Sequence, residues 1–113
     1  MGYDLHITRA KWHFENQGQW ITADEWLEYI ASDPELHLAG YNGAYFALWS
    51  GKSEYPDPWL DWFNGNVYSK IPDDAIVDKM VAIAKQLRAK VQGDDGGVYT
   101  GGGLGGYLPP PSD

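Results

Sequence analysis

The sequence contains no cysteine, which excludes a disulfide scaffold, a zinc site with cysteine ligands and a thiol nucleophile. Basic residues are also scarce, because 8 Lys and Arg stand against 16 Asp and Glu, for a formal net charge of −8. Nucleic acids and anionic membranes both select positively charged surfaces, so neither is an expected partner. The sequence has no apolar run of the roughly 18 residues that predict a membrane-spanning helix.

The first residues of the chain show neither the basic start nor the apolar core of a secretory signal. We therefore expect a cytoplasmic protein. A length of 113 residues fits one domain. We expect this domain to span residues 1–100, and we expect residues 101–113, which are rich in Gly and Pro, to form a flexible tail.

The apolar pattern predicts an α+β fold. Tyr3–Thr8 alternates apolar and polar residues as a half-buried strand does, and Asn-Gly pairs at 42–43 and 64–65 predict two hairpins. A capping box at Thr22–Glu25 starts one helix, and apolar residues at steps of three and four over Ile76–Val91 indicate a second. We expect a mostly antiparallel sheet of about five to six strands with two helices packed on one face.

Two glycine-containing patterns lack the context that their chemistry requires. Gly101, Gly103 and Gly106 have the spacing of a dinucleotide-binding loop, but the prolines that follow exclude the helix that would hold the pyrophosphate. The turn that begins at Asp94 lacks the ligand spacing of a calcium loop. No other segment matches a catalytic motif, so we expect no cofactor and no catalytic residue.

The three histidines offer no metal site on a helix, because none of His6, His13 and His37 is three or four residues from another. His6 and His37 lie in expected strands, where they could meet across a sheet. His13 lies in a polar segment that also carries Trp12 and Phe14, and we expect this segment to fold back on the domain. We expect no bound metal.

An acidic and aromatic cluster is the most suggestive feature of the chain. It consists of Tyr55, Asp57, Trp59, Asp61 and Trp62. In a regular strand the two tryptophans point to opposite faces. The cluster is consistent with three roles: filling the core, binding a sugar beside carboxylates, or forming the hot spot of a protein interface.

Four sets of residues carry a resemblance to known proteins. They are Met1–Arg9; Ile21–Trp26 with Ser32–Leu36; Phe63–Lys70 with Pro72–Asp73; and Val91–Gly96. Together they resemble small standalone bacterial proteins of uncharacterised type, some of which look like immunity proteins of polymorphic or secretion-delivered toxins. The resemblance implies a toxin as partner. It assigns no residue roles, because immunity proteins bind their toxins through different surfaces.

These observations lead to the hypothesis of an immunity or inhibitor protein, not an enzyme. It would neutralise a cognate, basic toxin domain through the acidic and aromatic cluster; the helix acids Asp24, Glu25 and Glu28 are the second choice of surface. One alternative is a small-ligand or carbohydrate-binding module that uses exposed Trp and Tyr. A less favoured alternative is a small enzyme that pairs a histidine such as His6 or His37 with Asp61 and holds that histidine, with a shifted pKa, in a cleft. A homodimer also stays open, since an exposed aromatic edge can accept a second copy.

Overall fold

The computed structural model describes residues 3–70 and 73–110. Met1, Gly2, Ile71, Pro72 and residues 111–113 of the expected tail lie outside the described residues. The elements are β1 (Asp4–Thr8), α1 (Ala23–Ser32), β2 (Leu36–Leu38), the 3-10 helix η1 (Gly40–Asn42), β3 (Ala47–Trp49), β4 (Trp59–Phe63), β5 (Asn66–Lys70), α2 (Asp74–Gln86), β6 (Lys90–Gly93), β7 (Val98–Tyr99), the 3-10 helix η2 (Gly103–Gly106) and β8 (Tyr107–Leu108).

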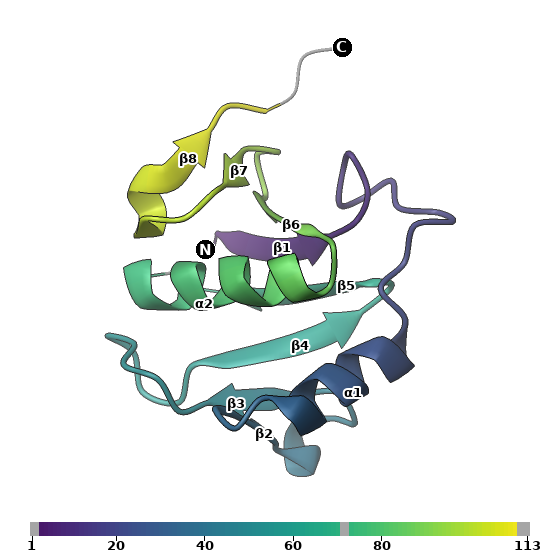
Figure 1. The fold of residues 1–113 in the computed structure, drawn as a ribbon, viewed down its shortest axis with the longest axis vertical. Helices are drawn as coiled ribbons and strands as arrows, with labels where there is room; N and C mark the ends of the chain where they lie inside the picture. The colour runs from purple at the N-terminus through teal and green to yellow at the C-terminus, as the bar shows by residue number, and fades with distance from the viewer. Residues whose placement is uncertain (1–2, 71–72, 111–113) are drawn as a thin grey trace.

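The strands form one sheet in the order β2-β3-β4-β5-β1-β6-β7-β8, and every neighbouring pair is antiparallel (Figure 1). The α+β class and the antiparallel sheet are confirmed. The expected count of five to six strands is wrong, because the described residues form 8. The additional strands include β7 and β8, which have two residues each. A two-residue strand is too short to show the alternation that predicts strands from sequence.

The hydrophobic core lies between the two helices and one face of this sheet. Leu5 and Ile7 of β1 are fully buried there, in the same cluster as Trp26 of α1 and Met80 of α2. Alternate residues of a strand point to opposite faces, so His6 lies on the other side. We call the side of the sheet that faces away from α1 and α2 the open face. In the part of the chain that the structure describes, neither helix has the length and apolar character to cross a membrane.

The start of α1 forms as the sequence predicts. Thr22 accepts a 3.1 Å hydrogen bond from the Glu25 backbone, and the Glu25 carboxylate accepts a 2.9 Å bond from the Thr22 backbone. Ile21 and Trp26 flank this capping box and are both fully buried, which matches a hydrophobic staple. Arg9 makes a bidentate ion pair with Glu25, in which Nη1 donates to Oε1 and Nη2 donates to Oε2, each at 2.9 Å.

The two predicted hairpins both form, with different turns. Between β4 and β5, Asn64 and Gly65 have φ angles of 54° and 88°, as a tight turn of the mirror-image type requires. Between β2 and β3 the chain instead passes through η1, and each strand has three residues. The Asn42-Gly43 pair is therefore part of a longer connection rather than a two-residue turn.

The glycine-rich segment after Thr100 is ordered through its contacts with α2. The backbone N–H of Gly103 donates to Asp78 at 2.7 Å, and that of Leu104 donates to Asp74 at 2.8 Å. β8 then pairs with β7 at the edge of the sheet. The structure thus does not show the expected flexible tail over Gly103–Leu108. Carboxylates of the protein itself occupy the backbone donors that a dinucleotide loop would offer to phosphate.

Candidate functional site

The open face carries a row of aromatic side chains. Phe46 and Trp59 are stacked with their ring centroids 5.2 Å apart, and Trp59 meets Tyr68 edge-on at 5.5 Å. Asp61 lies directly opposite Tyr68 in the β4-β5 register, so both side chains point to the same face. We call Phe46, Trp59 and Tyr68 the aromatic row. The two helices pack on the other side of the sheet, and the three side chains of the row are half-buried.

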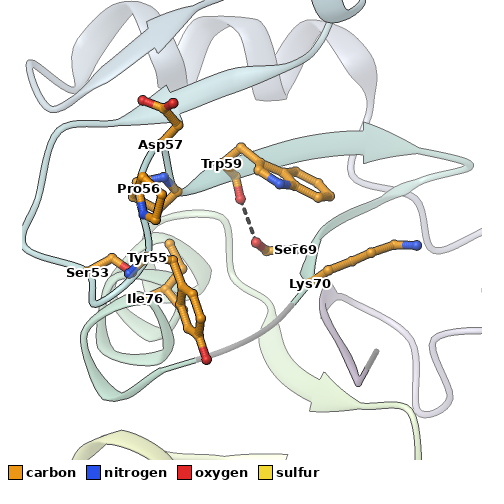
Figure 2. A pocket seen from close by; sticks show the side chains of 9 residues that line it. Ser53, Tyr55, Pro56, Asp57, Trp59, Ser69, Lys70 and Ile76 are labelled. Carbon is orange, nitrogen blue, oxygen red and sulfur yellow. Dashed lines mark hydrogen bonds between the residues drawn. The ribbon is translucent and has the colours of Figure 1, made fainter. Parts of the chain in front are cut away.

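A cavity of about 250 Å³ lies beside one end of the row. It is lined by Ser53, Tyr55, Pro56, Asp57, Pro58, Trp59, Ser69, Lys70 and Ile76. Figure 2 shows the Tyr55 ring beside Ile76, with Trp59 above them on β4 and the Asp57 carboxylate pointing away from the Tyr55 ring. The cavity is therefore lined mainly by aromatic and aliphatic groups, and Asp57 and Lys70 are its two charged residues.

One buried carboxylate holds the loop that shapes this cavity. Asp73 accepts hydrogen bonds of 2.6 Å from both the Ser53 hydroxyl and the Glu54 backbone N–H, and its other oxygen caps α2 through the Ile76 N–H at 2.8 Å. Burial works to raise the pKa of Asp73, but these hydrogen bonds outweigh it and hold the pKa below its usual range. Asp73 is therefore ionised at neutral pH. It also positions Tyr55 through Ser53, whose hydroxyl oxygen accepts a 3.1 Å hydrogen bond from the Tyr55 backbone N–H.

Asp61 has a different environment. It is half-buried beside Tyr68, and burial raises its pKa while a hydrogen bond from the Trp62 backbone partly opposes the shift. Burial also raises the pKa of Tyr68, and the negative charge of Asp61 adds to that effect. A carboxylate that has lost part of its hydration gains more than an exposed one from a cation that docks against it.

Trp62 lies on the helix side of the sheet, as the parity argument predicts for one of the two tryptophans. Its indole N–H donates to the Ile21 carbonyl at 2.8 Å, and its ring meets Trp20 and Tyr45 edge-on. Trp62 thus fixes the segment before α1. The structure brings Tyr55, Asp57 and Trp59 to one cavity and places Asp61 on the same face, but it separates Trp62 from this group.

A second cavity, of about 260 Å³, opens near β1. In it the rings of His6 and His13 are stacked 3.8 Å apart and are nearly parallel, and His6 Nε2 donates to Asp94 at 2.9 Å. Burial lowers the pKa of His13, and His6 lowers it further, while Asp94 and Asp4 oppose the shift. The enzyme alternative predicts a histidine with a shifted pKa in a cleft, and His13, which that alternative does not name, has both features.

Sequence reasoning missed this histidine pair because contacts distant in sequence create it. The segment after β1 folds back as expected, but its position is set by two buried side chains of the sheet. Gln92 accepts from the His13 backbone N–H at 2.7 Å, and Asn66 donates to the His13 carbonyl at 2.8 Å. His37 lies on β2, which three other strands separate from β1, and it does not join the pair. The aromatic residues around His13 were the one signal that this segment covers the sheet.

Comparison with known proteins adds no assignment. No family model, curated protein or solved structure matches this chain. The resemblance to immunity proteins therefore stays an expectation. Function has to be inferred from the geometry and chemistry of the sites themselves.

Proposed function

We propose that this chain is a binding protein whose open face docks a basic protein partner, and that the partner is a toxin domain which the chain neutralises. One observation carries the proposal: α1 and α2 pack on the same side of the sheet, so neither helix covers the half-buried aromatic row, and Asp61 lies beside it. Partly exposed aromatic side chains next to carboxylates are typical of protein interfaces, where Trp and Tyr supply much of the affinity.

The charges favour a basic partner. The chain has a net charge of −8, which steers a positively charged protein toward it and speeds association. At the site itself, Asp61 is already half-buried in the free protein. A lysine or arginine of the partner that docks beside Tyr68 and Asp61 would satisfy this carboxylate and lie against an aromatic ring.

The loop beside the row is prepared for binding. Its Ser53 and Glu54 are fixed by Asp73, and Asp57 holds a left-handed backbone conformation with φ of 51°. Loop ordering is one of the main entropic penalties of association, and a loop that is fixed in the free protein avoids much of it. Tyr55 and Asp57 can then extend the contact made by Trp59.

The cavity beside Tyr55 also favours a second candidate, the carbohydrate or small-ligand module. Its volume of about 250 Å³ is close to the lower end of ordinary ligand pockets, and aromatic rings suit the apolar faces of sugars. This candidate predicts a saturable change in tryptophan fluorescence with a small sugar, and loss of that change in Trp59→Ala. The basic-partner proposal predicts no such change.

Affinity capture tests the main proposal. The tagged chain and two variants, Asp61→Asn and Glu28→Gln, serve as baits in extracts of the source cells. Each variant removes one negative charge, from the open face and from the exposed side of α1 respectively. We expect the wild type and Glu28→Gln to retain the same basic protein in stoichiometric amount, released by high salt, and Asp61→Asn to retain less.

The other outcomes of this capture contradict the proposal in different ways. Loss in Glu28→Gln alone would move the binding surface to the acids of α1. Equal retention by both variants would remove Asp61 from the interface. Recovery of the bait alone would argue against a protein partner and favour the small-ligand candidate. A retained basic protein that lacks toxic activity when produced alone would support binding of a basic partner and contradict the proposal that this partner is a toxin.

A further inference from the structure

The histidine pair near β1 has the composition of a metal site. One nitrogen from each of His6 and His13 and one carboxylate oxygen of Asp94 lie within 4.8 Å of one another. Zinc bonds to nitrogen and oxygen of about 2.0–2.2 Å place neighbouring tetrahedral ligands roughly 3.3 Å apart. Metal binding therefore requires side-chain rotations that turn the stacked rings apart and direct the three atoms at one point.

His13 has an unused ring nitrogen. Its Nε2 is buried and has no hydrogen-bond partner among the described residues. Buried polar atoms are nearly always paired, and an unpaired one calls for an explanation such as an absent ion. The backbone of His13 is fixed on both sides by Gln92 and Asn66, and its ring stacks on His6 and meets Phe14 edge-on.

Asp94 is held in a similar way. One carboxylate oxygen accepts from the Asp4 backbone N–H at 2.9 Å, and the other accepts from His6 at 2.9 Å. Support of a ligand by a fixed backbone donor is typical of the outer shell of metal sites, where it orients the ligand. The opposite oxygen stays directed at the histidine pair.

The surroundings favour a cation. The cavity is lined by Asp4, His6, His13, Phe14, Phe63, Asn64, Asn66 and Tyr68, and this lining includes no Lys or Arg among the described residues. Asp4 adds a second carboxylate close to the pair. Two neutral imidazoles and a carboxylate select zinc and its first-row neighbours over magnesium or calcium, which prefer oxygen ligands.

We propose that His6, His13 and Asp94 bind one divalent transition-metal ion of the zinc class. The ion replaces the hydrogen bond between His6 and Asp94 with a bond to each of them, and it uses the free Nε2 of His13 as a third ligand. His6 then keeps its proton on its other ring nitrogen. The fourth position opens to the cavity, where water or a partner's side chain can enter. The site links β1, the segment that carries His13 and the β6-β7 turn.

Zinc titration of the chelator-treated protein tests this proposal. Calorimetry gives stoichiometry and affinity, and NMR spectra of the histidine rings report which residues respond. We expect one zinc ion per chain, movement of the His6 and His13 signals, and unchanged His37 signals. His13→Gln and Asp94→Asn should each weaken binding by about tenfold or more. His37→Gln, which removes the histidine outside the site, should bind zinc like the wild type.

Three results would overturn the proposal. They are the absence of saturable zinc binding, zinc binding that moves His37 rather than the pair, and equal affinity in His13→Gln and His37→Gln. Circular dichroism checks that each variant folds. If His13→Gln does not fold, the wild-type NMR titration and Asp94→Asn decide the question. Thermal unfolding is a second readout, since an ion that binds only the folded state raises the melting temperature.

Discussion

The Ser53 hydroxyl donates a 2.6 Å hydrogen bond to Asp73, the residue that caps α2. One carboxylate thereby connects the first turn of a helix to the loop that carries Tyr55. Asp73 is the N-cap residue of α2, and its side chain accepts a hydrogen bond from the backbone of the first turn, as is usual for an aspartate at this position. The loop depends on that cap, because its position is fixed by the second oxygen of the same side chain.

Asp73→Ala should therefore affect both elements. We expect it to lower the free energy of unfolding by about 2 kcal/mol or more, because it removes the cap of α2 and also the acceptor of the Ser53 hydroxyl and the Glu54 N–H. Ser53→Ala removes one loop contact and should lower it by about 1 kcal/mol. Urea unfolding measures both values. Equal effects of the two variants would show that the cap and the loop are not coupled through Asp73.

Acid stability should depend on Glu25. Hydrogen bonds from Arg9, followed by that from the Thr22 backbone, lower the pKa of Glu25 from 4.5 to about 2. A carboxyl with a lowered pKa in the folded state stabilises the fold above its unfolded pKa, and this contribution is lost as pH falls through its folded pKa. We expect stability to decline between pH 4.5 and about 2, and Glu25→Gln to remove part of that decline.

Glu28→Gln on the same helix is the control for this experiment. Glu28 is exposed, and its neutralisation should leave the acid limb of the stability curve close to that of the wild type. Urea unfolding at a series of pH values gives the curves. A Glu25→Gln curve that is parallel to the wild-type curve over this range would show that the contact with Arg9 does not contribute to stability there.

The order of the glycine-rich segment should depend on Gly103. Its φ is 67°, and a Cβ at this position would lie 2.4 Å from an Asp74 oxygen. The left-handed backbone alone disfavours alanine by about 1–2 kcal/mol, and the clash displaces the carboxylate that holds Leu104. We expect Gly103→Ala to release η2 and β8, with faster amide exchange at Tyr107 and Leu108.

Gly105 provides a matched control two residues away. A Cβ there meets no atom within 4 Å, and its φ is not among the positive angles of the chain. Gly105→Ala should therefore leave amide exchange in β8 nearly unchanged. Similar exchange in the two variants would mean that η2 does not hold β8 against the sheet.

The parts of the fold that follow local rules could be predicted from sequence. The capping box at Thr22 needs two side chains three residues apart, and the turn at Asn64-Gly65 needs two residues that accept positive φ. Both formed as predicted. The opposite orientation of Trp59 and Trp62 also follows from the period of a strand alone.

The parts that depend on contacts between distant segments could not be predicted in this way. The glycine-rich segment has no apolar pattern, and its order comes from Asp74 and Asp78 on α2. The pairing of His6 with His13 likewise depends on Gln92 and Asn66, whose roles are invisible in the local sequence. The same limit applies to the candidate surface, since the loop that brings Tyr55 to the cavity beside Trp59 is held by Asp73, which is distant in sequence.

The most direct test of the proposed function is calorimetry with the captured partner and two tryptophan variants. Trp59 belongs to the aromatic row, whereas Trp20 is 42% exposed and packs against Trp62, away from the row. We expect Trp59→Ala to weaken binding by about 2 kcal/mol or more, roughly 30-fold, and Trp20→Ala to bind nearly as the wild type does. Equal affinities of the two variants, or a partner that binds Trp59→Ala as tightly as the wild type, would contradict binding through the open face.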